Sequence, residues 1–136
     1  MRGYLLDTNL LSEVLKKRPD PRVLEGLRAA SARRLCTSAV CIAELRQGAA
    51  RHPSGERLWE RIAGEVLPRV RILPLGEAEA IRAGDLLATL EARGEPIGIE
   101  EVLIGATALV GDLALVTRNT RHFDRIPGLA VESWWQ

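Results

Sequence analysis

Residues 4–9 of this chain are Tyr4-Leu5-Leu6-Asp7-Thr8-Asn9, and the run Leu10-Leu11-Ser12-Glu13-Val14-Leu15 follows them. The apolar first half is typical of a buried strand, whereas Asp, Thr and Asn are poor strand residues that favour helix starts. The second run has the apolar spacing of a helix. We therefore expect a strand that places Asp7 at its carboxyl end, before a helix from about Leu10. Ligands bind at this edge of open α/β sheets, so Asp7 is either a functional carboxylate or only a helix cap.

The composition indicates one folded domain. The chain has 136 residues, of which 46% are apolar and 27% are charged. This length suffices for one core but not for two ordinary domains, so we expect a single domain over residues 1–136. Lys16 and Lys17 are the only lysines, and arginine carries the rest of the positive charge. Arginine suits phosphate contacts, but arginine-rich usage also follows genome composition, and a net charge of +1 identifies no partner.

The chain shows no signal-peptide run and no apolar stretch of membrane-spanning length. Cys36 and Cys41 are too few and too close for a disulfide framework, and their spacing is not that of a zinc site. We therefore expect a cytoplasmic protein with two small, buried, reduced cysteines and no membrane partner.

Strand and helix patterns alternate along the rest of the chain. Further strands are predicted over 35–37, 71–75, 113–117 and 131–135, the last at a sheet edge. Helices are predicted from Asp20-Pro21, after Ser38, over 56–67, from Glu77 to near Gly94, and over about 99–109. In the helix from Glu77 the inward residues are expected to be Ala80, Ile81, Leu86, Leu87 and Leu90. The alternation predicts an α/β fold, with a mainly parallel central sheet of four to five strands flanked by helices.

Three carboxylates and one amide fall at predicted strand ends or helix starts. They are Asp7, Glu44, Glu101 and Asn119. Each alone has a simpler interpretation, because a lone helix glutamate is usually exposed and acids suit the first turn of a helix. Together they would meet at one sheet edge, where three carboxylates need a cation or shared protons. Oxygen ligands favour Mg²⁺ or Mn²⁺, so the pattern suggests metal-dependent phosphoryl transfer.

Four motifs in order resemble a known family. They are Leu5-Leu6-Asp7-Thr8-Asn9, Ser38-Ala39-Val40-Cys41-Ile42-Ala43-Glu44-Leu45, Pro96-Ile97-Gly98 leading to Glu101-Val102-Leu103-Ile104-Gly105-Ala106-Thr107-Ala108, and Leu115-Val116-Thr117-Arg118-Asn119-Thr120-Arg121-His122-Phe123. From Leu5 to Trp134 the chain resembles PIN-domain proteins of the VapC toxin family. The resemblance implies a PIN-like three-layer sandwich and an Mg²⁺- or Mn²⁺-dependent endoribonuclease. It further implies the toxin of a type II toxin–antitoxin pair, commonly a homodimer, neutralised by a small DNA-binding VapB-like antitoxin.

The resemblance also assigns residues to the catalytic and metal site. Asp7 and Glu44 match the first two family acids, Glu101 stands where the family usually has aspartate, and Asn119 falls where many members have a fourth acid. Matching polar positions nearby are Thr8, Asn9, Ser38 and Thr117. Residues expected to hold the RNA backbone are Arg46, Arg118 and Arg121. His52 and His122 are interpreted as surface histidines, and Trp134 and Trp135 as packing or dimer residues.

Two functions remain open at this point. The chain is a ribonuclease, or it is a catalytically weakened PIN-fold module that mainly engages its antitoxin, as Glu101 and Asn119 would favour. In either case the first two helices carry more apolar surface than one sheet face can cover, which suggests a groove for an amphipathic antitoxin segment. The residues of that surface are Leu10, Leu11, Leu15, Val23, Leu24 and Leu27.

Overall fold

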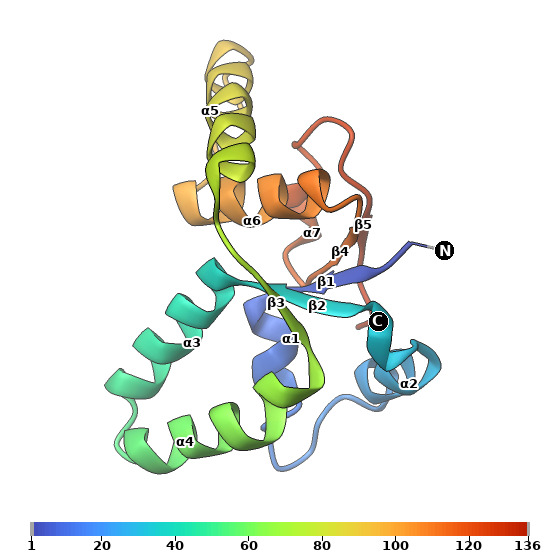
Figure 1. The fold of residues 1–136 in the computed structure, drawn as a ribbon, viewed down its shortest axis with the longest axis vertical. Coiled ribbons are helices and arrows are strands. Elements are labelled where there is room, and N and C mark those ends of the chain that lie inside the picture. The colour runs from blue at the N-terminus through green and yellow to red at the C-terminus, as the bar shows by residue number, and fades with distance from the viewer. Residues whose placement is uncertain (1, 136) are drawn as a thin grey trace.

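The computed structural model describes residues 2–135 and places five strands in one all-parallel sheet of order β3-β2-β1-β4-β5 (Figure 1). The strands are β1 (Tyr4–Leu6), β2 (Leu35–Ser38), β3 (Arg71–Leu73), β4 (Ala114–Val116) and β5 (Val131–Glu132). All five lie where the sequence predicts them, and the predicted parallel α/β fold is confirmed. β1 and β4 are neighbours, so Asp7 and the residues after Val116 emerge at the same edge.

Helices cover both faces of this sheet, as the three-layer prediction requires. In Figure 1, α5, α6 and α7 lie on one side and α1, α2, α3 and α4 on the other. The helices are α1 (Thr8–Glu13), α2 (Pro21–Ala29), α3 (Ala39–Arg51), α4 (Gly55–Arg61), α5 (Glu77–Ala92), α6 (Ile99–Val110) and α7 (Thr120–Phe123). Short helical turns join some of them, namely η1 (Ala32–Arg34), η2 (Ile62–Val66, a π-helical turn) and η3 (Leu67–Arg69).

Alternation along β1 builds the two cores. Leu5 is fully buried with Val102 and Ile104 of α6, whereas the next residue, Leu6, packs with Leu10 and the residues of α1 to α4. Successive side chains on a strand point to opposite faces, so a two-residue apolar run suffices to hold both helical layers. The sheet edge that carries Asp7 is therefore anchored from both sides.

Side-chain caps fix the helix starts around the site. Asp7 caps α1 by accepting from the Thr8 backbone N–H, Asp20 caps α2, and Ser38 caps α3 through the Cys41 N–H. Helix α1 begins at Thr8 rather than at about Leu10, because the capping carboxylate lets the helix start immediately after β1. It is also shorter than predicted and ends at Glu13.

The predicted inward face of α5 is partly wrong. Leu86 and Leu90 are buried, but Ala80 is exposed and Ile81 keeps 60% of its surface exposed. The buried face of α5 is that of Ala83, Leu86 and Leu90, and Ile81, two positions before Ala83, lies about 200° away from it around the helix. Gly94 ends the helix as expected, and its positive φ of 66° explains why a glycine stands there.

Gly105 is required by a close approach. A Cβ at this position would lie 2.5 Å from Cδ1 of Ile126, whose side chain fills the space beside α6. The two residues dock the segment after α7 onto the helix that carries Glu101. No helix within residues 2–135 is both long and apolar enough to cross a bilayer.

Candidate metal centre

Asp7 stands at the junction of β1 and α1, and its side chain is 6% exposed. Its Oδ1 accepts from the Thr8 backbone N–H at 2.8 Å, and its Oδ2 accepts from the Thr117 hydroxyl at 2.7 Å. Weaker contacts come from Asn9 Nδ2 at 3.4 Å and the Cys41 thiol at 3.8 Å. These donors hold the carboxylate in one orientation while leaving lone pairs for a ligand.

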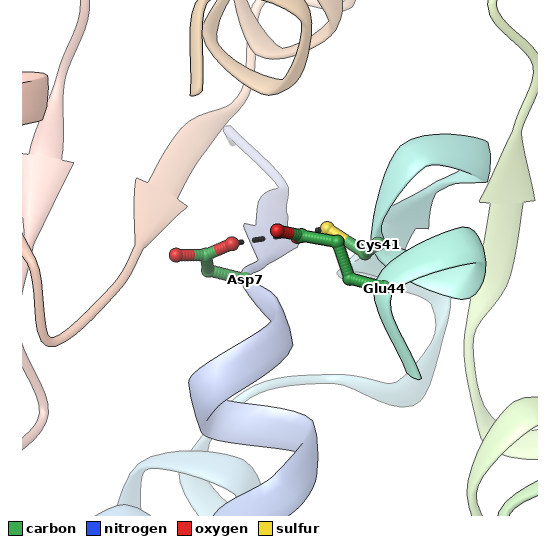
Figure 2. Close-up of side chains that lie close together, drawn as sticks. All are labelled: Asp7, Cys41 and Glu44. Atoms are coloured by element: carbon green, nitrogen blue, oxygen red, sulfur yellow. Dashed lines mark hydrogen bonds between the residues drawn. The ribbon is translucent and has the colours of Figure 1, made fainter. Parts of the chain in front are cut away.

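Glu44 reaches the same place from α3. The Thr8 hydroxyl donates to its Oε1 at 2.6 Å, so Thr8 bonds to both acids. Candidate ligand atoms of Asp7, Cys41 and Glu44 lie within 4.8 Å of one another, and Figure 2 shows the two carboxylates facing each other beside the sulfur. The structure therefore brings together the two acids that the sequence placed 37 positions apart.

Burial and mutual repulsion act on both acids. Burial is the main cause that raises the pKa of Asp7, with a smaller increase from the charge of Glu101, against the lowering effect of its hydrogen bonds. Burial also raises the pKa of Glu44, and the charges of Asp7, Glu100 and Glu101 add to it. Both shifts mean that the folded chain disfavours two adjacent negative charges, which a bound cation would relieve.

Glu101 lines the same cavity of about 490 Å³ as Asp7, Glu44 and Asn119, but it does not join the close group of Asp7, Cys41 and Glu44. Its Oε1 accepts from the Gly98 backbone N–H at 3.0 Å, which closes the first turn of α6. Its Oε2 lies 2.5 Å from Asn119 Nδ2 and 2.9 Å from His122 Nδ1. The carboxylate is thus bound to α6 and α7 at the rim of the cavity.

The remaining predicted polar residues support this arrangement unequally. Thr117 donates to Asp7 and accepts from the Asn119 N–H, while Asn9 accepts from the Arg118 N–H. Ser38 does not touch the acids: it is buried, caps α3 and contacts Cys41 Sγ at 3.2 Å. These residues therefore fix the backbone that carries the acids.

The three arginines that were predicted to hold RNA lie in different places. Arg118 lines the acidic cavity, with its guanidinium 5.7 Å from the centre of the Trp135 ring. Arg46 instead stacks over Trp59 at 4.8 Å, because two residues from Glu44 correspond to about 200° around a helix. Arg121 is exposed on α7 and, within residues 2–135, is not among the residues lining this cavity.

Sequence reasoning missed four residues of the cavity region. Cys41 could have been found, because it precedes Glu44 by three positions and so shares its helix face. His122 follows Asn119 by three positions, but nothing in the sequence pairs it with Glu101. Glu13 and Lys16, which also line the cavity, carry no sequence signal beyond their charge.

Glu13 is held as firmly as Asp7. Its side chain is 5% exposed and accepts from Lys16 Nζ at 2.9 Å, Trp135 Nε1 at 3.2 Å and the Asp20 N–H at 3.0 Å. These donors, Lys16 first and Trp135 second, lower its pKa to about 2. The ionised Glu13 therefore links α1, the start of α2 and the C-terminal segment through hydrogen bonds. Trp135 is a packing residue, as predicted.

The side chains fit a hard divalent cation. Asp7 and Glu44 offer carboxylate oxygens, and among residues 2–135 no cationic side chain forms an ion pair with either. The Cys41 thiol is less suited to such an ion, and burial followed by the charge of Asp7 raises its pKa, which keeps it protonated. Asp7 and Glu44 would be the direct ligands, with Glu101 across the cavity.

The chain resembles known proteins along nearly its whole length. The PIN domain model matches residues 4–129. VapC ribonuclease Y4jK of Sinorhizobium fredii is 36% identical over 97% of both chains, and the tRNA(fMet)-specific endonuclease VapC of Salmonella typhimurium is 31% identical over 98% of this chain and 99% of its own. Among solved structures, FitAcB from Neisseria gonorrhoeae superposes with a TM-score of 0.90 at 33% identity, covering 98% of this chain and 99% of its own. DNA-bound VapBC from Salmonella typhimurium gives 0.89 at 31% identity, with the same coverage.

Proposed function

This chain belongs to the PIN-domain family, among relatives that are VapC ribonucleases, and on that premise we propose that it is a metal-dependent endoribonuclease and the toxin of a type II toxin–antitoxin pair. The observation that carries the proposal is the pair of facing carboxylates, Asp7 and Glu44, in a cavity that Glu101 and Asn119 also line. The paired carboxylates leave negative charge that a divalent cation, Mg²⁺ or Mn²⁺, would neutralise.

The bound ion would supply Lewis-acid polarisation of a phosphodiester and a more acidic water. The chain itself orients the ligands. Thr8 and Thr117 fix Asp7 through its two oxygens, and Thr8 also fixes Glu44. Arg118 and Lys16 at the cavity wall provide positive charge for the RNA backbone.

The test is cleavage of an end-labelled single-stranded RNA by the purified chain. We expect cleavage with Mg²⁺ or Mn²⁺, loss of cleavage with a chelator, and recovery when the metal is restored. Cleavage that continues unchanged in excess chelator would contradict the proposal.

A second function is favoured by one observation, the binding of Glu101 to Asn119 and His122. A carboxylate held at the rim contributes less to a metal site, so the chain could act chiefly as a binding module for its antitoxin. The two functions differ in the expected effect of shortening Glu101 to aspartate.

The proposed partner is a small VapB-like antitoxin. Toxin FitB of Neisseria gonorrhoeae is 35% identical to this chain, and a toxin–antitoxin complex from Klebsiella pneumoniae superposes with a TM-score of 0.74 at 26% identity. Here, Leu10, Leu11 and Val23 of the predicted docking surface are buried in the core, which corrects the expected excess of apolar surface. Leu15, Leu24 and Leu27, together with the more deeply buried Leu10 and Leu11, line a groove of about 1140 Å³ beside α1 and α2, which we assign to an antitoxin segment. A homodimer in the cytoplasm remains our expectation for the assembled toxin.

A further inference from the structure

A second hollow adjoins the acidic cavity. Its volume is about 390 Å³, and its walls come from α1, α3, α4 and η2. Four residues line both spaces, namely Thr8, Ser12, Lys16 and Glu44. The hollow is therefore continuous with the site that would cut RNA, and it lies on the α3–α4 side of Glu44.

The walls of this hollow are chemically unlike those of the acidic cavity. Leu15 and Leu58 contribute apolar side chains to its walls, and the buried residues Leu45 and Ile62 form its floor. His52 stands at one end. Its Nδ1 accepts from the Ser54 backbone N–H at 3.0 Å, so the neutral ring presents Nε2–H as a donor.

We propose that this hollow binds the base of the nucleotide next to the scissile phosphate, so that the substrate is RNA that is unpaired at that position. The inference rests on the proposed ribonuclease function and adds where the substrate's base is held. Apolar walls beside the ring N–H of His52 suit a planar base. The Lys16 ammonium is paired with Glu13 but its side chain is 56% exposed, so it keeps N–H donors for the phosphate of the same nucleotide. A base within a duplex could not enter, because its edge and faces are already occupied.

The chain leaves this space open at a glycine. Gly48 on α3 lines the hollow, and a Cβ built there would meet no atom within 4 Å. A leucine at this exposed helical position would project into the open space without a clash. It would also favour the helix, since glycine costs a helix interior about 0.7–1 kcal/mol relative to good helix formers.

Gly48→Leu is therefore the variant that blocks the hollow. The matched control is Gly84→Leu on α5, where a Cβ likewise meets nothing within 4 Å and whose residues line neither the acidic cavity nor the hollow. Each protein is tested on an oligoribonucleotide with one cleavage site and on the same strand with an abasic sugar on either side of the scissile phosphate, in turn.

We expect wild type and Gly84→Leu to lose on the order of 10-fold or more in kcat/KM when one of the two flanking bases is removed. Gly48→Leu should show a comparable loss on the intact strand and no further loss on that abasic strand. Equal kcat/KM for Gly48→Leu and wild type on the intact strand would overturn the proposal. So would a Gly48→Leu variant that loses only antitoxin binding, because the hollow would then hold a protein side chain.

Binding separates this inference from the ribonuclease function. The affinity of the three proteins for the same intact and abasic strands is measured in chelator, where no cleavage occurs. If wild type cuts no RNA but prefers the strand with the base, and Gly48→Leu does not, the hollow is a base site while the proposed activity fails. If the strands bind equally well to wild type, the base site fails whatever the activity.

Discussion

Nδ1 of His122 lies 2.9 Å from Oε2 of Glu101, so this carboxylate is tied to α7 and not to the other acids. The extra methylene of glutamate makes this reach possible, because it moves the carboxylate by more than an ångström. Asn119 shares the same oxygen. The two functions proposed for the chain therefore differ in what Glu101 contributes to the metal site.

Shortening this side chain separates the two candidate functions. If the chain is an efficient ribonuclease, Glu101→Asp should cleave RNA within a few-fold of wild type, and Glu101→Ala should lose on the order of 10-fold or more. If it is a weakened module, Glu101→Asp should instead be faster than wild type. Steady-state kcat/KM on one RNA at fixed Mn²⁺ decides this, and equal rates for wild type and Glu101→Ala would remove Glu101 from the site.

Arg118 should hold the RNA backbone, whereas Arg121 should not. Only Arg118 of this pair lines the acidic cavity, where it stacks on Trp135. Arg118→Ala should weaken RNA binding and reduce the slope of log affinity against log salt by about 0.7, the value for one single-strand phosphate contact. Arg121→Ala is the matched control. An unchanged slope in Arg118→Ala would contradict the assignment.

Glu13 should stabilise the fold in a pH-dependent manner. Its pKa is lowered from 4.5 to about 2, so the folded chain favours the ionised form. The stabilisation should therefore be complete above about pH 5 and fade as the pH falls toward 2. Glu13→Gln keeps the size but loses the charge, and it should lower the free energy of unfolding by about 2 kcal/mol at pH 7. Urea unfolding of both proteins at pH 7 and pH 3 measures the difference, which should shrink at pH 3. A constant difference would show that the charge is not responsible.

Antitoxin and metal should compete. We expect a basic group of the antitoxin to reach the acidic site, where it would meet Asp7 and Glu44. Saturating Mn²⁺ should then weaken antitoxin binding, and antitoxin should weaken Mn²⁺ binding by the same factor. Calorimetric titration with the proposed VapB-like antitoxin gives both values. Equal affinities with and without Mn²⁺ would mean that the partner covers the RNA path and leaves the metal site free.

The sequence predicted the sheet well because its signals are local. The run of Leu5 and Leu6 followed by Asp7 indicates a buried strand that ends in a helix cap. Ser38 indicates the start of α3 in the same manner. These two local patterns also bring Asp7 and Glu44 to one edge, since neighbouring parallel strands end together.

Residues that depend on packing between distant segments were not predictable in this manner. Which face of α5 turns inward is decided by its packing on α6: Ala83, Leu86 and Leu90 are buried there, and Ile81 lies on the opposite side of the helix. Arg46 was expected to hold the RNA backbone, but its position on α3 turns it toward Trp59. His122 and Glu101 lie 21 positions apart, on α7 and α6, and no sequence pattern predicts their contact.

The central claim is that Asp7 holds a divalent metal needed for RNA cleavage, and Asp7→Asn tests it most directly. Because burial and the charge of Glu101 raise the pKa of Asp7, the neutral amide should leave the metal-free fold as stable as wild type or more stable. Asp85→Asn, at an exposed position of α5, makes the same chemical change away from the site. With Mn²⁺ present, Asp7→Asn should lose on the order of 100-fold or more in cleavage rate while Asp85→Asn keeps the wild-type rate. A folded Asp7→Asn protein that cleaves the same RNA as fast as wild type would contradict the account.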